Sequence, residues 1–169
     1  PEWDLAVGKR TREVSDLRDR EGSAAKKDLV AHWTFDERTG TTAADATGNG
    51  HAGRLMGRAQ WTDGKSGGGI RFDGENAWVE IPNDAGVEKV QESDYTLALW
   101  FKPEGVPTGT GDQNNGAYGL IMKPGNHLGL VYTRQQRFHV DHWVTPSANM
   151  GVTTGKEYPP GAFHHVAGV

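Results

Sequence analysis

The sequence predicts an all-β fold in which antiparallel strands pack as a sandwich. Three observations support this fold class. Apolar and polar residues alternate with the period of two that is typical of half-buried strands, and turn residues separate these segments at fairly even intervals. Glycine makes up 24 of 169 residues without a regular repeat, which favours many turns between short strands. From residue 29 onward, helical periodicity is absent.

The N-terminal segment 1–28 differs from the rest, because it carries many charged residues and few large apolar ones. Its apolar residues form a partial heptad stripe, which consists of Trp3, Val7, Val14, Leu17 and Ala24. Gly8 and Gly22 interrupt the stripe, and each costs a helix about 1 kcal/mol relative to alanine. We predict a charged helical or linker segment, with a solvated charged helix or plain disorder as the alternatives.

The first predicted strand is 29–36, where alternation places Trp33 and Phe35 on one sheet face that needs a second layer to cover it. The loop at 45–51 contains an aspartate, an asparagine and two glycines, a composition that allows a tight turn. Asp73-Gly74 is a hairpin signal, because such a turn needs positive φ. Shorter alternating segments predict further strands at 51–56, 69–73 and 77–81.

The clearest strand is 94–102, because apolar residues on both of its faces predict a strand that is covered on both sides. Pro103 ends it, since proline cannot donate to the strand ladder. Pro124-Gly125-Asn126 predicts a hairpin connection. The remaining predicted strands are 117–123, 127–133, 136–144 and 162–169. The polar segments 103–116 and 145–161 are predicted to be long binding loops.

Charge and composition exclude several functions. A net charge of −4 gives no basic field for nucleic acid, so we expect no nucleic-acid partner. No apolar run is long enough to span a membrane, so we expect no membrane insertion. The absence of cysteine excludes thiolate zinc sites, thiol nucleophiles and disulfides. The chain starts at Pro1 and stops within an apolar run, so we expect a piece of a longer polypeptide.

Six motifs occur along the chain in a fixed order. They are LVAHWTFDE (29–37), DATGNGHAG (45–53), GKSGGGIRFDG (64–74), AWVEIPN (77–83), YTLALWFKPE (95–104) and FHHVAGV (163–169). Together they resemble the laminin-G-like, concanavalin A-like jelly-roll family, in particular its bacterial branch of accessory modules. The resemblance covers about residues 29–169. It implies an antiparallel jelly-roll β-sandwich that follows the charged segment 1–28.

The resemblance also implies features of the whole protein. Family members carry a further stretch after the position that matches Val169, with a final strand that pairs beside the first strand. We therefore expect the domain 29–169 to be incomplete at its C-terminus, which leaves one edge of 29–36 without a neighbour. The family occurs in multidomain exported proteins. This implies an extracytoplasmic location (periplasmic, cell-surface or secreted) and other domains of the same polypeptide as partners.

The loop at 45–51 is a candidate calcium site. Ca²⁺ takes about six to eight oxygen ligands from carboxylates, amides and backbone carbonyls. Asp45 and Asn49 lie in the loop, Asp36 lies just past the strand end, and the resemblance implies a structural metal near this loop in some members. We therefore predict Ca²⁺ at Asp36, Asp45 and Asn49. The alternative is an Asx turn in which Asp45 accepts hydrogen bonds from backbone N–H groups.

The strand 136–144 carries a candidate ligand-binding face. Alternation places His139, Asp141 and Trp143 on one side of the strand and His142 on the other. An aromatic ring beside hydrogen-bonding groups is suited to a carbohydrate, so we predict that these three residues bind the ligand. Other tryptophans that can stack on a sugar ring, if they are exposed, are Trp61, Trp78 and Trp100. Of these, Trp100 lies in the central strand and is more typical of a core residue.

Catalysis is not expected. Glycoside hydrolases use two carboxylates that face the sugar, which on a strand requires acids two or four residues apart. The strand 136–144 offers only Asp141 and the strand 77–81 offers only Glu80. Asp84 is also predicted to be solvated rather than catalytic. We therefore assign no catalytic residue and predict that the chain is not an enzyme.

These observations predict a non-catalytic recognition module of a larger exported protein. Its expected ligand is a glycan or a protein, and calcium is its candidate cofactor. Two alternatives stay open. The sandwich is either a structural spacer that only positions its neighbours or, as the third choice, a fragment of a glycoside hydrolase.

Overall fold

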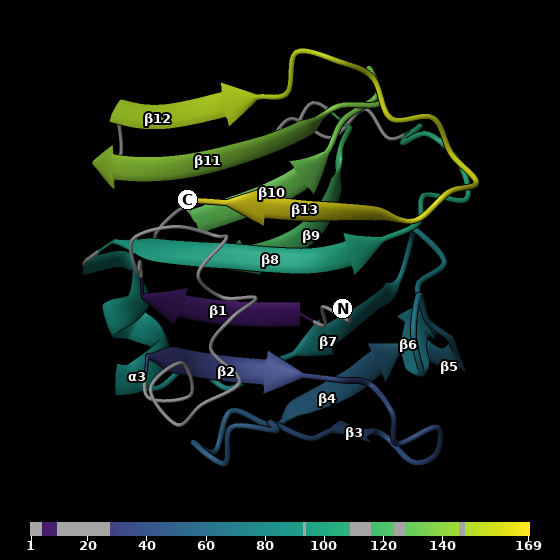
Figure 1. The fold of residues 1–169 in the computed structure, drawn as a ribbon, viewed down its shortest axis with the longest axis vertical. Coiled ribbons are helices and arrows are strands. Elements are labelled where there is room, and N and C mark those ends of the chain that lie inside the picture. Colours follow the sequence, from purple (N-terminus) through teal and green to yellow (C-terminus); the bar gives the residue numbers. More distant parts are fainter. Residues whose placement is uncertain (1–4, 10–27, 93, 109–115, 124–127, 146–147) are drawn as a thin grey trace. The chain divides into compact units, whose positions relative to one another are not determined.

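The computed structural model describes residues 5–9, 28–92, 94–108, 116–123, 128–145 and 148–169 (Figure 1). The strand pairs described below are all antiparallel, and the helical elements within these residues are short: α3 (Ala85–Glu88) and η1 (Lys89–Glu92). The predicted fold class, all-β with antiparallel sheets, is therefore confirmed. Within the described residues, no helix has the length and apolar character needed to span a membrane.

The chain divides into two compact units, which are described separately. The first unit contains residues 1–100 and Val169, and the second contains residues 101–168. The domain boundary predicted at residue 28 stays a prediction, because residues 10–27 lie outside the described part of the chain.

The first unit contains three groups of paired strands. Its strands are β1 (Leu5–Lys9), β2 (Leu29–Trp33), β3 (Thr42–Ala43), β4 (Gly53–Gly57), β5 (Gln60–Asp63), β6 (Gly68–Arg71), β7 (Ala77–Glu80) and β8 (Tyr95–Phe101), the last of which ends at the division between the units. β1 pairs with both β2 and β8, β4 pairs with both β3 and β7, and β5 pairs with β6. The short strands β3 and β5 were not predicted from the sequence.

The strand β1 corrects the prediction for part of the N-terminal segment. Residues Leu5–Lys9 were predicted to be helical or disordered, but they form a strand. Trp3, Leu5 and Val7 lie two residues apart, as in a strand, whereas Trp3 and Val7 also fit the heptad stripe, so the pattern was ambiguous over these few residues. Leu5 lies opposite Trp33, so β2 gains a neighbour that was not expected there. The prediction for residues 1–4 and 10–27 lies outside the described residues.

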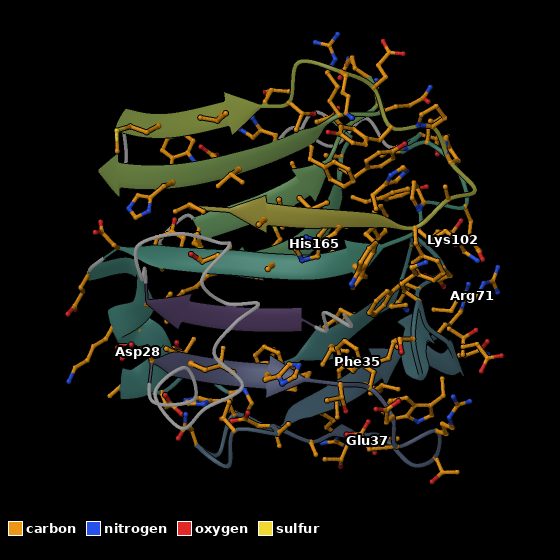
Figure 2. The ribbon with its side chains drawn as sticks, viewed as in Figure 1. Asp28, Phe35, Glu37, Arg71, Lys102 and His165 are labelled. Atoms are coloured by element: carbon orange, nitrogen blue, oxygen red, sulfur yellow. The ribbon has the colours of Figure 1, made fainter. Side chains whose placement is uncertain are left out.

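The core of the first unit forms around β2. Ala31, Trp33, Ala43 and Leu55 are buried together, and partly buried apolar residues pack around them: Phe35, Ala59, Trp61, Ile70, Val79 and Ile81. β2 ends at Trp33, earlier than the predicted residue 36, because Phe35 adopts a φ of 59°, which does not continue a strand. Figure 2 shows Phe35 and Glu37 on the segment that follows β2. This segment leads toward the loop at 45–51, which we call the Asp45 turn.

The second unit contains a four-stranded sheet in the order β12-β11-β10-β9 (Figure 1). Its strands are β9 (Tyr118–Lys123), β10 (Leu128–Tyr132), β11 (Phe138–Thr145) and β12 (Ala148–Thr153), and β13 (His164–Gly168) also belongs to this unit. β12 was not predicted, whereas β9, β10, β11 and β13 lie close to their predicted ranges. β11 therefore has a neighbour on each side, which determines what surrounds its side chains.

One face of this sheet is buried by aromatic packing. Tyr132 and Phe138, which are 0% and 3% exposed, have ring centroids 5.4 Å apart. Tyr158 packs on Phe138 with a centroid separation of 5.0 Å, and its carbonyl oxygen accepts a 2.8 Å hydrogen bond from the hydroxyl of Tyr132. Because successive residues of β11 point to opposite faces, burial of Phe138 directs its neighbour His139 to the other face.

Candidate functional site

The strand β11 carries the predicted ligand-binding residues on one face. His139, Asp141 and Trp143 alternate with Phe138 and Val140, and all three are half-buried. This placement is the one that alternation predicts. The role of the three residues in binding stays a prediction.

Hydrogen bonds restrict the three side chains. The indole Nε1 of Trp143 donates to Oδ2 of Asp141 at 2.7 Å. On the neighbouring strand β12, Oγ1 of Thr153 lies 2.8 Å from Nδ1 of His139. Side chains that are already restricted lose less conformational entropy when a ligand binds, so this geometry favours recognition.

Glycines flank Asp141 on both neighbouring strands. Gly129 of β10 and Gly151 of β12 lie directly opposite Asp141. A Cβ atom at Gly151 would lie 2.7 Å from Cε1 of His139, and one at Gly129 would lie 3.2 Å from Sδ of Met122. The glycines therefore give the imidazole ring and the thioether the space to lie along the sheet beside Asp141.

We call the four residues Met122, His139, Asp141 and Trp143 the β11 face. The face combines an indole ring, a carboxylate, an imidazole and a thioether, and Met122 is 45% exposed. Apolar surface with a few placed polar groups is typical of sites for small ligands. Asp141 is the only acidic residue in the sequences of β9–β12, so these strands do not supply the second carboxylate that glycoside hydrolysis needs.

Asp45, a residue of the predicted calcium site, forms the centre of a tight turn. Its Oδ1 accepts hydrogen bonds from the N–H of His32 at 3.1 Å, from the N–H of Thr47 at 3.0 Å and from the hydroxyl of Thr47 at 2.7 Å. Its Oδ2 accepts from the N–H of His51 at 3.1 Å. The side chain is only 2% exposed. These bonds form the Asx turn that was the alternative interpretation.

The same hydrogen bonds set the acidity of Asp45. Burial raises the pKa of the carboxyl, but the hydrogen bonds from Thr47, His32 and His51 stabilise its charged form and lower the pKa from 3.8 to about 2. The side chain therefore acts as a permanent acceptor near neutral pH.

The other two residues of the predicted calcium site contact separate parts of the backbone. Oδ1 of Asp36 accepts from the N–H of Gly68 at 2.6 Å. Nδ2 of Asn49 donates to the carbonyl oxygens of Leu29 at 3.1 Å and Val30 at 3.0 Å. In the described part of the chain, no three His, Asp or Glu side chains gather as metal ligands. The oxygens of these residues do not form a calcium cage, so the ion stays a prediction that rests on the resemblance.

The backbone carbonyl of His51 was a possible ligand of the predicted calcium ion, but no role for its imidazole was predicted from the sequence. His51 is 5% exposed, and its Nδ1 and Nε2 lie 3.3 Å and 3.4 Å from carboxylate oxygens of Asp45 and Asp84. Asp84 was predicted to be solvated, and its side chain is 48% exposed; it also caps α3 by accepting from the N–H groups of Gly86 and Val87 at 2.7 Å and 3.0 Å. The imidazole thus links the Asp45 turn to the start of α3. No sequence pattern connects these distant residues.

Comparison with known families identifies the domain. The profile of the concanavalin A-like lectin/glucanases superfamily, in its laminin G form, matches residues 73–169, which is more than half of the chain. The chain belongs to this superfamily. No curated protein and no solved structure matches the sequence.

Membership of the concanavalin A-like superfamily confirms the resemblance and the β-sandwich fold class that the motifs predicted. The matched residues include β7 to β13 and therefore all of the β11 face. The superfamily contains both lectins and glucanases by its own description, so membership indicates a class of binding domain and does not name a ligand.

Proposed function

We propose that the chain is a non-catalytic recognition module that binds carbohydrate through the β11 face. The observation that supports this most directly is the Trp143–Asp141 pair beside His139, with glycine opposite Asp141 on both neighbouring strands. A sugar ring stacks on the indole, the carboxylate accepts hydrogen bonds from its hydroxyl groups, and the imidazole adds a further polar contact.

Binding by this face is reversible and involves no chemical step. The carboxylate of Asp141 is oriented by Trp143, and β9–β12 hold no second acid that could complete a hydrolytic pair. The resemblance places such a module in a larger exported protein, where it would bring neighbouring domains to a glycan. This wider role belongs to the proposal and rests on the family context.

A glycan array followed by calorimetry tests the proposal. The full chain should bind at least one glycan, and Trp143→Ala should weaken that binding by roughly tenfold, which corresponds to a loss of about 1.4 kcal/mol. Asp141→Asn should weaken it less, since the amide keeps one acceptor oxygen. Asp63→Asn is the matched control, because Asp63 has a side chain that is 87% exposed on a different strand.

The competing functions predict different results. If the chain is a structural spacer, it should bind no glycan on the array. If it is a fragment of a glycoside hydrolase, it should release reducing sugar from a polysaccharide. A protein ligand is a second candidate, which the exposed Met122 favours because methionine is common at adaptable protein-binding surfaces. If the chain binds no glycan on the array but binds a protein in solution, and Met122→Ser abolishes that binding, the ligand is a protein and the carbohydrate proposal is wrong.

A further inference from the structure

Trp78 is an exposed tryptophan on β7. It is 45% exposed, whereas Val79, the next residue, packs against the core of the first unit. Tryptophan is highly buried on average, so a half-exposed indole on a regular strand needs an explanation.

Two other tryptophans of the same unit show what a structural role looks like. Trp33 is 3% exposed, and its Nε1 donates to the carbonyl oxygen of His51 at 2.7 Å. Trp61 packs against the core, and its Nε1 donates to the carbonyl oxygen of Gly40 at 2.8 Å. Within the described residues, the indole N–H of Trp78 has no such acceptor. The exposed part of its ring and its N–H group are therefore available to a ligand.

The neighbours of Trp78 on the adjacent strands complete a mixed surface. Met56 of β4 lies opposite Trp78, Arg54 lies opposite Glu80, and Thr42 of β3 lies opposite Arg54. Directly opposite residues of antiparallel strands point to the same sheet face. Arg54, Glu80 and Thr42 are exposed, and Met56 is half-buried. We call these five residues the Trp78 surface.

The charges and size of this surface indicate its ligand. Arg54 and Glu80 have opposite charges on adjacent strands, so the surface has no net field that would attract a polyanion. Its apolar part consists of one indole and one thioether, which is far smaller than the roughly 800 Å² per partner of a stable protein interface. An indole with a nearby donor and acceptor matches one face and two hydroxyl groups of a sugar ring.

We propose that the Trp78 surface is a second carbohydrate contact that takes a neutral pyranose ring. The ring stacks on Trp78 against Met56, the guanidinium of Arg54 donates to one hydroxyl, and the carboxylate of Glu80 accepts from another. This inference rests on the proposed function, because it assumes a carbohydrate-binding module, but it assigns a surface on a different sheet from the β11 face. Two contacts on one chain would let the module engage a polysaccharide at two places.

Affinity electrophoresis of the full chain tests the inference. Migration is measured in gels that contain a neutral β-glucan, galactomannan or dextran, and in a gel that contains heparin as the polyanion. The variants are Trp78→Ala, Trp78→Tyr and Trp143→Ala. Phe72→Ala is the matched control, because Phe72 is an aromatic residue with a similar exposed fraction of 44% outside the Trp78 surface. Thermal unfolding of each variant verifies that it is folded.

We expect at least one neutral polysaccharide to retard the chain, and heparin not to. Trp78→Ala should then weaken the binding by roughly tenfold, while Trp78→Tyr, which keeps an aromatic face, should stay within about threefold of the unmodified chain. Phe72→Ala should bind like the unmodified chain. No retardation in any neutral gel, retardation by heparin alone, or an unchanged affinity of a folded Trp78→Ala variant overturns the inference.

The two tryptophan variants separate this inference from the proposed function. Loss of binding in Trp143→Ala with no change in Trp78→Ala supports the β11 face and overturns the Trp78 surface. Loss in Trp78→Ala alone supports the Trp78 surface and overturns the assignment of the β11 face. Partial loss in both variants supports two contacts.

Discussion

Two aspartates show how the same side chain takes different roles in this chain. The side chain of Asp45 is 2% exposed and accepts four hydrogen bonds from His32, Thr47 and His51 within a tight turn. Asp141 is half-buried on a regular strand, is bonded by Trp143, and has a glycine opposite it on each side. The donors to the first carboxylate are backbone N–H groups and the hydroxyl of Thr47, whereas the second carboxylate lies on a strand face beside the ring of His139 and the side chain of Met122. Under the proposed function, Asp45 contributes to folding stability and Asp141 contributes to ligand binding.

Removal of each carboxylate is the strongest test of this comparison. Asp45→Ala should lower the free energy of unfolding by about 3 kcal/mol, because it leaves buried N–H groups without an acceptor. Asp141→Ala should lower it by less than about 1 kcal/mol, since its partner Trp143 is only half-buried. Urea unfolding measures both values. Equal losses would show that Asp141 is also a structural residue.

Lowering the pH should reproduce part of the loss of stability that Asp45→Ala causes. The pKa of Asp45 falls from 3.8 in the unfolded chain to about 2 in the folded protein, because hydrogen bonds to the charged form outweigh its burial. A depressed folded pKa stabilises the fold above about pH 4, and this contribution of about 2 kcal/mol is lost as the pH falls toward 2. Urea unfolding at several pH values should show this loss for the unmodified chain and not for Asp45→Asn. Parallel curves for the two proteins would contradict the assignment.

Local patterns made part of this structure predictable. Alternation placed His139, Asp141 and Trp143 on one side of the strand, opposite the buried Phe138, whereas Met122, which comes from another strand, was not predicted. The Asx turn at Asp45 was one of the two interpretations made from the sequence, because the hydrogen bond from the N–H of Thr47 to Asp45 spans only two residues. In both places the chemistry is encoded within a few positions of the chain.

Other features depend on contacts between distant residues and could not be predicted. His51 lies between Asp45 and Asp84, and nothing near Asp84 in the sequence indicates that contact. Alternation predicts that Trp78 and Val79 lie on opposite faces of β7. Which of the two faces meets the core depends on distant contacts, so the exposure of Trp78 could not be predicted. β12 (Ala148–Thr153) was missed because it lies within 145–161, where prolines, glycines and polar residues predicted a loop.

Substitution of Gly151, which lies opposite Asp141 on β12, should have a smaller effect on stability and binding. Gly151→Ala should displace the His139 ring, because its new Cβ would lie 2.7 Å from Cε1 of His139. The ring is the far end of a side chain that can rotate, and the backbone oxygen of Val140, 3.2 Å from the new Cβ, needs only a small shift. The free energy of unfolding should therefore change by less than about 1 kcal/mol, while the affinity for a glycan should fall about threefold. Calorimetry and urea unfolding measure the two quantities.

Gly155→Ala is the matched control for this substitution. Gly155 has no heavy atom within 4 Å of the position of an added Cβ, so its substitution should leave both the affinity and the stability nearly unchanged. If Gly151→Ala behaves like Gly155→Ala in the binding assay, the orientation of His139 is irrelevant to recognition, and the β11 face reduces to Asp141 and Trp143.

Among these tests, the addition of calcium should change the stability of the protein least. The resemblance predicts an ion at Asp36, Asp45 and Asn49, but a cation at Asp45 would have to compete with four N–H and O–H donors that already satisfy its carboxylate. The midpoint of thermal unfolding should therefore differ by less than about 1 °C between excess calcium and a chelator. A rise of several degrees that is lost in Asp36→Ala would establish the predicted metal site. Asp45 would then resemble Asp141, as a carboxylate that binds an external partner, and the contrast between the two aspartates would no longer hold.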